Sequence, residues 1–216
     1  MNCIVTAGPT FEPLDGARRL TNFSTGRLGT EMGNHLVGRG HHVKLLLGEQ
    51  TTWRGNSEAQ EVVTFTTTAD LAGRLQSSTK ERVDAVFHAA AVSDFAFGKV
   101  WRRLPDGQLE PVQARKISTR QGELLAELVP TQKIIAQLRG WFPSACLVGW
   151  KYELDGQRAD VIAEAERQIA DYHTNACVAN GSGYGTGFGL VTAPGRCVHL
   201  GDASSLFTAL ENLALR

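Results

Sequence analysis

Short apolar runs alternate with segments of helical periodicity along most of the chain. Apolar runs rich in β-branched residues predict strands, and apolar residues spaced three or four apart predict amphipathic helices. Strands are predicted at residues 2–7, 43–47, 62–66, 84–90, 145–150 and 175–179, followed by a hairpin of 188–192 and 196–200. Helices are predicted at 26–37, around Leu71 and Leu75 with Thr68 or Asp70 as the cap, after Thr131, at 157–172 and at 203–215.

This alternation defines the expected fold class. Short strands that are apolar throughout are typical of a parallel sheet with helices on both faces. We therefore expect an α/β fold with a doubly wound, mostly parallel, Rossmann-like sheet, and ligands at the carboxyl ends of its strands. The irregular, basic stretch at 96–123 is expected to be an inserted flap, either a long loop or a hairpin. No repeat or linker divides residues 1–216, so a single domain is expected.

Composition and charge exclude several classes of protein. Lys+Arg and Asp+Glu number 22 each, and this balance argues against nucleic acid or an anionic membrane as the main partner. No apolar run approaches the roughly 18 residues of a membrane helix. Residues 1–5 lack the basic start of a signal peptide, so a cytoplasmic protein is expected. None of the four cysteines forms a C-x-x-C pair, which predicts reduced thiols and no metal site built from protein residues alone.

Two polar segments follow the first predicted strand. The turn that contains Gly8 and Thr10 can present backbone N–H groups to anionic oxygens, or it is only a tight turn. Further on, Asn22 and Ser24 stand beside Gly26 where a helix is predicted to begin. Ser24 or its neighbour Thr25 can cap that helix. Because one cap needs only one polar residue, the crowding of polar residues favours recognition of a phosphate or carboxylate at the helix N-terminus.

Small and charged residues end two later strands. Ala90 and Ala91 allow a flat ligand to approach the backbone, and Asp94 follows them, either to accept hydrogen bonds from a ligand or to cap a turn. In the segment Gly149-Trp150-Lys151, the indole either stacks on a base or fills the core. The lysine either meets a phosphate or pairs with Glu153.

The basic flap holds a further candidate. Lys116, beside Arg115, can neutralise polyphosphate charge during phosphoryl or nucleotidyl transfer, which depends mainly on positioning and electrostatics. The other interpretation is an exposed, solvated charge run.

Several well-defined motifs are absent from the sequence. It contains no G-x-x-x-x-G-K-[ST], no G-x-S-x-G, and no G-x-G-x-x-G in its first turn. No Tyr is followed four residues later by Lys. A Rossmann-like NAD(P)-dependent reductase, suggested by the His88-Ala89-Ala90 strand end, is therefore the alternative rather than the main hypothesis.

Taken together, the motifs resemble the phosphopantothenate–cysteine ligase family, also called phosphopantothenoylcysteine synthetase. The resemblance covers most of the chain: VTAGPTFEPLD, TNFSTGRLG, HAAAVSDF, RKIS, LVGWKYELD and ACVAN occur in the family's order. It implies a ligase of coenzyme A biosynthesis that joins 4′-phosphopantothenate to cysteine through an acyl-nucleotidylate, with Mg²⁺ on the nucleoside triphosphate. It also implies a homodimer. The flavin-dependent decarboxylase that precedes this domain in bacterial bifunctional proteins has no counterpart here, so we expect a stand-alone form without flavin.

The resemblance also implies residue roles. Asn22 matches the asparagine that steadies the acyl-nucleotidylate, and its side-chain N–H groups suit a developing oxyanion. Asp94 matches the nucleotide-contacting aspartate, and Lys116 the flap lysine that meets the phosphates. Arg18 lies where the family has an arginine that binds the phosphate of phosphopantothenate.

The sequence departs from the bacterial, CTP-using members. Phe11 replaces an arginine in the first loop, Ser118 and Thr119 follow the flap motif where lysine is found, and the helix 157–172 has no lysine. NFSTGR, AAAVSDF and the K-x-E-x-D of 151–155 resemble the ATP-using, eukaryotic-type members. ATP is therefore slightly favoured over CTP, and a noncatalytic nucleotide-binding paralogue stays an alternative.

Overall fold

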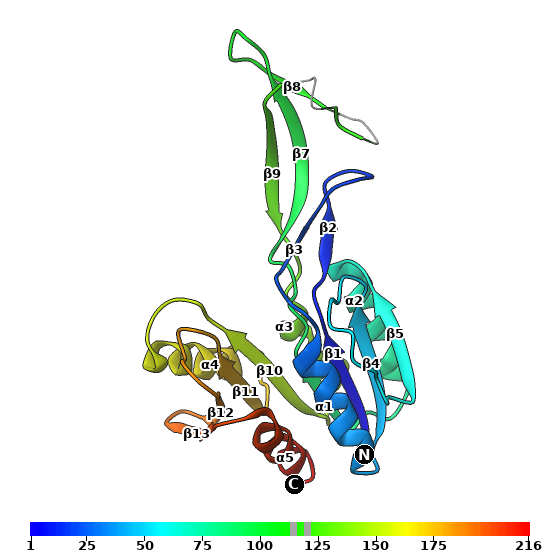
Figure 1. Cartoon of the computed structure of the whole chain (residues 1–216), viewed down its shortest axis with the longest axis vertical. Helices are drawn as coiled ribbons and strands as arrows, with labels where there is room; N and C mark the ends of the chain where they lie inside the picture. The colour runs from blue at the N-terminus through cyan, green and yellow to red at the C-terminus, as the bar shows by residue number, and fades with distance from the viewer. Residues whose placement is uncertain (113–115, 119–121) are drawn as a thin grey trace.

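The computed structural model describes residues 1–112, 116–118 and 122–216 and has a central eight-stranded sheet (Figure 1). The strand order is β13-β12-β11-β10-β6-β1-β4-β5, and the strands from β11 to β5 in this order are parallel. The strands of the sheet are β1 (Asn2–Ala7), β4 (His42–Gly48), β5 (Glu61–Phe65), β6 (Ala85–His88), β10 (Cys146–Tyr152), β11 (Ala176–Asn180), β12 (Phe188–Ala193) and β13 (Arg196–Leu200). The last two are the predicted antiparallel hairpin. The predicted doubly wound, mostly parallel sheet is confirmed.

Helices cover both faces of the sheet (Figure 1). They are α1 (Arg27–Gly38), α2 (Thr68–Ser77), α3 (Ile134–Trp141), α4 (Arg158–Tyr172) and α5 (Ala203–Ala214), with a short 3₁₀ helix, η1 (Ser78–Lys80), after α2. Helices α1 and α5 pack on one face of the sheet, and α2, α3 and α4 supply buried side chains on the other.

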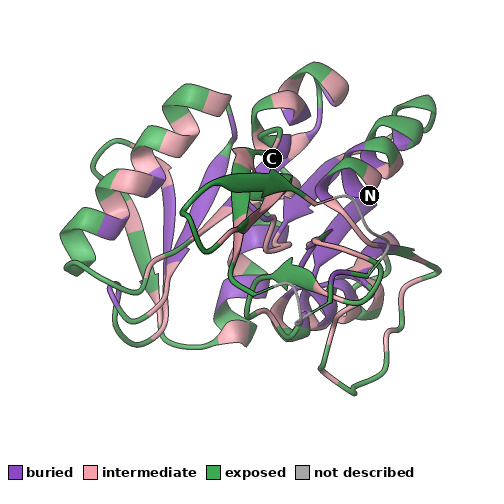
Figure 2. Ribbon diagram, turned by 90° about the horizontal axis from the view of Figure 1, so that it is seen from above, coloured by how far each residue is buried: buried purple, intermediate pink, exposed green. Residues whose placement is uncertain are grey.

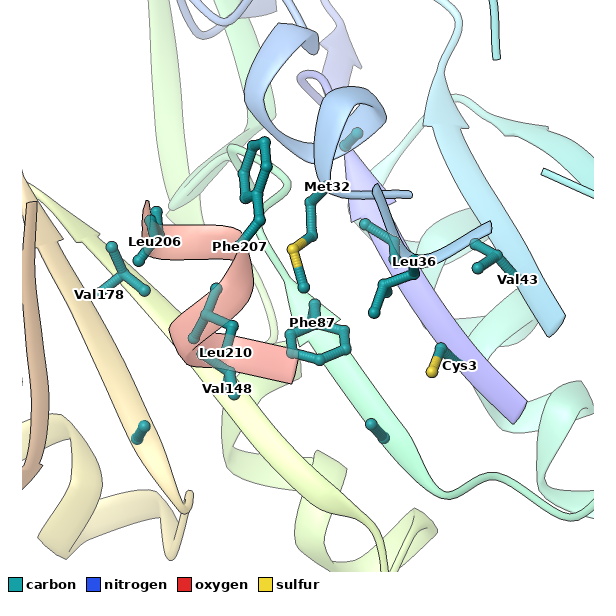
Figure 3. Close-up of a cluster of buried hydrophobic side chains, with 14 of the residues drawn as sticks. Cys3, Met32, Leu36, Val43, Phe87, Val148, Val178, Leu206, Phe207 and Leu210 are labelled. Atoms are coloured by element: carbon teal, nitrogen blue, oxygen red, sulfur yellow. The ribbon is translucent and has the colours of Figure 1, made fainter. Parts of the chain in front are cut away.

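The core forms where central strands are buried on both sides. Val5 of β1 and Phe87 of β6 belong to the cluster with α1 and α5, while their neighbours Ile4 and Val86 belong to the cluster with α2 and α3. Figure 3 shows Met32 and other side chains of α1 and α5 meeting over Phe87. Successive residues of a strand point to opposite faces, so a strand covered on both sides must be apolar throughout. This requirement explains the uninterrupted apolar runs in the sequence.

A polar cluster fastens α5 to α1. The buried carboxylate of Glu211 lies 3.1 Å from the Nε2 atoms of His35 and His41 and 3.2 Å from Nε of Arg39. These hydrogen bonds hold the pKa of Glu211 below its usual value although burial acts in the opposite direction. A buried carboxylate needs such partners, so the C-terminal helix is fixed by polar contacts as well as by its apolar stripe.

The helix caps differ from the prediction. Thr67, rather than Thr68 or Asp70, caps α2: its hydroxyl accepts the N–H of Asp70 at 3.1 Å. Helix α1 begins after Gly26, whose φ of 79° lies in the left-handed region and which, as the N-cap residue, has no side chain to bond the helix. Of the two residues considered as caps, Thr25 contacts the helix start: its hydroxyl accepts the N–H of Arg27 at 3.3 Å.

An antiparallel arm projects from the sheet (Figure 1). It contains β7 (Phe95–Arg103), β8 (Leu109–Pro111) and β9 (Leu124–Pro130), in the order β8-β7-β9. The insertion thus runs from residue 95 to 130, beyond the expected 96–123. A small hairpin, β2 (Phe11–Pro13) with β3 (Arg19–Thr21), lies beside the arm and was not predicted. In Figure 2 buried residues follow the central sheet, and the arm is mostly exposed.

Gly8 directly follows β1, where the chain passes close to the segment that contains Thr51. Its φ is 81°, and a Cβ there would lie 2.3 Å from Oγ1 of Thr51. Gly26 meets the same side chain, at 2.7 Å from Thr51 Cγ2. These two glycines are required both by backbone conformation and by space.

We expect Gly8→Ala to lower the free energy of unfolding by about 2 kcal/mol, because strain and overlap with Thr51 add together. Gly73→Ala is the matched control. Gly73 is exposed within α2, and a Cβ added there would have no other atom within 4 Å, so alanine should stabilise by about 0.5–1 kcal/mol. Urea denaturation of both variants checks this, and equal stability of the two would contradict the described turn.

Candidate active site

A cleft of about 670 Å³ opens where β1, β6 and β10 end. β1 and β6 are neighbours at the centre of the sheet. The strand of the sheet that follows β1 in the chain, β4, lies on one side of this pair, and the strand of the sheet that follows β6, β10, lies on the other. Parallel α/β sheets bind ligands at this position. The expected site residues that line the cleft are Gly8, Asn22, Ser24, Gly26, Ala90, Ala91, Asp94, Trp150 and Lys151. Four other expected residues, Thr10, Gly149, Arg18 and Lys116, do not line it.

The floor of the cleft is made by two joined strand ends. The N–H of Ala91 donates to the Gly8 carbonyl at 2.9 Å, and the N–H of Thr10 donates to the Ala91 carbonyl at 3.1 Å. Thr10 is fully buried, and its hydroxyl accepts the Ser93 N–H at 2.8 Å. Both its N–H and its hydroxyl hold the turns together in this structure, and a ligand contact of Thr10 stays a prediction.

Asn22 reaches from the hairpin to the same turn. Its Nδ2 donates to the carbonyls of Ala91 at 3.2 Å and Val92 at 3.1 Å. Two carbonyl partners assign the nitrogen to this side and leave Oδ1 as the remaining polar atom. The amide N–H groups expected to face an oxyanion are thus engaged with the protein in this structure, and they must exchange partners to reach a ligand.

Helix α1 brings its N-terminus to the cleft. Ser24, Gly26 and Arg27 line the cleft here, and the first turn of the helix contains no acidic residue. The Thr25 hydroxyl accepts the first N–H of the helix, that of Arg27, at 3.3 Å. The N–H groups that follow it and the positive end of the helix dipole favour an anion at this position. The predicted anion-binding character of this segment therefore has its geometric basis in α1.

Asp94 and Lys133 form an ion pair at the rim of the cleft. Lys133 Nζ lies 2.6 Å from Asp94 Oδ1, and both side chains are more than half exposed. Thr131 ties the two segments together, because its N–H donates to the Asp94 carbonyl at 2.9 Å and its hydroxyl to Ser93. Sequence reasoning missed Lys133, whose only signal was its place after Pro130, directly before a helix.

At the end of β10, Trp150 and Lys151 both line the cleft and make contacts within the protein. Lys151 pairs with Glu153 at 3.0 Å and also lines the cleft. Trp150 packs against the core and lines the cleft, while its buried Nε1 has no hydrogen-bond partner among the described residues. Gly149 is structural, since a Cβ there would lie 2.6 Å from Ile135 of α3 and 2.3 Å from Gln168 of α4. Its expected ligand contact stays a prediction.

Arg18 and Lys116 line a second cleft of about 500 Å³, together with Ala17, Ile117 and Ser118. This cleft shares no lining residue with the first. Within one copy of the chain, the structure therefore brings Lys116 together with Arg18 and not with Asn22 or Asp94. Arg115 lies outside the described residues.

His88 is a further residue of the first cleft that sequence reasoning did not assign to the site. Its Nδ1 lies 2.9 Å from the Thr6 hydroxyl, which also accepts the Ala90 N–H at 3.1 Å. Burial lowers the pKa of His88 to about 4, so the ring is neutral at neutral pH. It orders the turn without adding charge; the signal in the sequence was a histidine at a strand end.

Three further observations concern metal ligands, membrane helices and cysteines. In the described ranges, no group of three or more His, Cys, Asp or Glu side chains is arranged to hold a metal ion. No helix formed by those same residues combines the length and the apolar character needed to cross a bilayer. All four cysteines are free, and burial raises the pKa of Cys3 and Cys177 to about 12.

The fold and the cleft define an α/β protein of Rossmann-like topology with an antiparallel insertion at the rim of its candidate site. The family described as the DNA/pantothenate metabolism flavoprotein C-terminal domain matches residues 1–200. The chain belongs to this family.

Similar proteins agree with this assignment. The coenzyme A biosynthesis bifunctional protein CoaBC of Thermococcus kodakarensis is 30% identical over 179 residues, which are 82% of this chain and 40% of that protein. CoaBC of Bacillus subtilis is 28% identical over 194 residues, 88% of this chain and 43% of that protein. A cysteine/cysteine sulfinic acid decarboxylase from an unknown prokaryotic organism is 29% identical over 185 residues, 84% of this chain and 47% of that protein. The chain thus spans less than half the length of these relatives.

Solved structures show the same fold. The DNA/pantothenate metabolism flavoprotein from Streptococcus pneumoniae superposes with a TM-score of 0.82 at 21% identity, covering 98% of this chain and 97% of that one. A Cab2 mutant in complex with phosphopantothenate-cysteine superposes with a TM-score of 0.75 at 18% identity, covering 99% and 86%.

His88 makes the stability of the protein depend on pH. Between pH 6.5 and about 4 the unfolded chain binds a proton at this histidine and the folded chain does not, so stability falls as the pH is lowered through this range. The expected loss is at most about 3 kcal/mol. His88→Gln should flatten the slope of unfolding free energy against pH in this window. His42→Gln, at an exposed position, should keep the wild-type slope. Parallel slopes for wild type and His88→Gln would show that His88 is not the responsible group.

Proposed function

We propose that this chain is the phosphopantothenate–cysteine ligase domain of coenzyme A biosynthesis. The observation that carries the proposal is the first cleft: in a member of this family, one rim combines a helix N-terminus without acidic residues in its first turn, Asn22 and Asp94. The Cab2 structure, in complex with phosphopantothenate-cysteine, supports the same substrate class through a shared fold.

The proposed reaction has two steps. A carboxylate oxygen of 4′-phosphopantothenate attacks the α-phosphorus of a nucleoside triphosphate, and pyrophosphate leaves. The amine of cysteine then attacks the carbonyl carbon of the acyl-nucleotidylate; the nucleotide leaves, the amine loses a proton, and the amide remains. Catalysis of this kind depends mainly on orientation and on stabilising developing negative charge.

The residues of the first cleft have separate roles in this proposal. The α1 N-terminus, with Ser24 and Gly26, holds phosphate oxygens, and Asp94 contacts the nucleoside after releasing Lys133. Asn22 turns its amide from the Ala91 and Val92 carbonyls toward the acyl group. The roles of Asn22 and Asp94 each exchange a contact already made within the protein for one made to the ligand.

Mg²⁺ accompanies the triphosphate in the proposal and neutralises part of its charge when bound. The residues present fit this ion, since Mg²⁺ on a triphosphate is held largely by phosphate oxygens and water and needs no cluster of carboxylates, and the described residues contain none. No flavin takes part in the reaction. ATP is favoured slightly over CTP on the sequence features that resemble ATP-using members.

A homodimer would complete the site. Within one copy, Lys116 and Arg18 line the second cleft, whereas Asn22 and Asp94 line the first. A second copy that brings its Arg18 and Lys116 to the first cleft would supply cations for the phosphates of phosphopantothenate and of the triphosphate. Two-fold symmetry would then build two such sites.

The direct test is turnover of purified protein with ATP or CTP, 4′-phosphopantothenate, cysteine and Mg²⁺. We expect pyrophosphate release that requires the acid, and an amide product that requires cysteine, detected by mass spectrometry. NADPH binding without triphosphate binding would instead indicate the reductase alternative. Binding of a triphosphate with no turnover would indicate a noncatalytic paralogue.

Asn22→Ala should lower kcat by about a hundredfold or more, because a donor to the developing oxyanion is lost. Asn34→Ala is the matched control: Asn34 also makes two hydrogen bonds, to Asn56 and Glu58, but does not line the cleft. It should turn over normally. Circular dichroism shows whether both variants are folded, and near-normal turnover by folded Asn22→Ala would refute the assigned role.

A further inference from the structure

The β2–β3 hairpin is linked to the flap segment 116–118 by one carboxylate. The Asp15 side chain is fully buried. Its Oδ1 accepts the N–H groups of Ala17 and Arg18, both at 2.8 Å, and its Oδ2 accepts the N–H of Ile117 at 3.0 Å. The same carboxylate therefore closes the turn between β2 and β3 and holds a residue about a hundred positions later in the chain.

Arg18 binds both Asp15 and the backbone of Ile117. Its Nε donates to Asp15 Oδ2 at 3.1 Å, its Nη2 also contacts that oxygen, and Nη2 donates to the Ile117 carbonyl at 2.7 Å. Both the N–H and the carbonyl of Ile117 are thus bound by the Asp15–Arg18 pair. The pKa of Asp15 is held well below its usual value, with Arg18 as the largest cause, so the carboxylate is charged at neutral pH.

Ile117 is the anchor of the segment. It is buried while its neighbours Lys116 and Ser118 are exposed. Lys116 makes no ion pair with any residue in the described part of the chain, and Asp15 is already neutralised by Arg18. Among the described residues, the Lys116 ammonium therefore gives the second cleft a positive charge that no carboxylate pairs with, on a backbone that is fixed at the next residue.

We propose that Asp15 is a positioning residue for Lys116: together with Arg18 it fixes the backbone at Ile117, so that the Lys116 ammonium is held ready for the phosphates of the nucleotide. This inference rests on the proposed ligase function. It also changes the role of Arg18, whose Nε and Nη2 hold the flap and leave only Nη1 without a hydrogen bond among the described residues. Fixing the backbone in advance removes an entropic cost that binding would otherwise carry.

The anchor is tested first by proteolysis, which requires no enzymatic activity. A lysine-specific protease cuts the Lys116–Ile117 bond only when that backbone leaves its place. In Asp15→Asn we expect this cut to be several-fold faster than in wild type, because a charged acceptor is lost. Asp106→Asn is the control, since Asp106 accepts an N–H within its own turn of the arm and does not touch residue 117. Asp106→Asn should be cut at the wild-type rate. If Asp15→Asn is also cut at the wild-type rate, the proposal is wrong.

Kinetics then separate positioning from general stability. Asp15→Asn should raise KM for the nucleoside triphosphate roughly tenfold and leave KM for cysteine unchanged. In a Lys116→Ala background the same substitution should have no further effect, since Asp15 acts through Lys116. Additive losses, or equal changes in every kinetic constant, would overturn the proposal.

A second variant and a readout that needs no ligase activity allow the proposal to be tested in every case. If Asp15→Asn does not fold, Arg18→Gln removes the two-point contact without adding a lysine, and should show the same faster cut after Lys116. If wild type shows no ligase activity, the proposed function fails, whereas the proteolysis still decides whether Asp15 anchors the segment.

Discussion

The pairing of the β1 and β6 ends is the constraint on which the candidate site depends. Backbone hydrogen bonds between Gly8, Thr10 and Ala91 hold two loops side by side. These loops are about eighty residues apart in the chain. Asn22 can reach the Ala91 and Val92 carbonyls only because this arrangement is fixed. Gly8 permits it because no larger residue fits against Thr51. The site is therefore a product of sheet order, and its polar side chains are arranged around a backbone framework that is already complete.

Polar groups in the first cleft are largely paired with one another. Asp94 pairs with Lys133, Lys151 pairs with Glu153, and the Asn22 amide is bonded to two carbonyls. His88 is neutral, so it neither attracts nor repels a phosphate. The exposed pairs contribute little to stability, since surface ion pairs are typically weak. They can therefore be exchanged for ligand contacts at small cost, and the α1 N-terminus is the element of the cleft already suited to an anion.

The sequence predicted the sheet and its helices well because burial on both faces forces an apolar pattern that is visible without a structure. Chain segments such as 2–7 and 175–179 lie within a residue of β1 and β11. The β2–β3 hairpin was missed because its strands are three residues long and its key contacts are polar. The α2 cap was misassigned by one residue, because Thr67 and Thr68 are both suitable caps and only the backbone angles select Thr67. The left-handed Gly26 at the start of α1 likewise depends on backbone angles that composition does not encode.

The position of a candidate residue could be predicted where it depends on the sheet, and not where it depends on side-chain packing. Residues at strand ends, such as Asp94 and Trp150, line the cleft because strand ends meet at one edge of a parallel sheet. Thr10 and Gly149 were assigned to the ligand because sequence cannot tell a residue that faces a cleft from one that packs beneath it. Lys133 was missed because its relation to Asp94 exists only in three dimensions.

The arm has a mechanical consequence. Strand β7 begins directly after Asp94, and β9 ends directly before Thr131, which bonds back to Ser93 and Asp94. The base of the arm and the rim of the cleft are thus the same few residues. Any displacement of the base of the arm would therefore also displace Asp94 and the segment that carries Lys133.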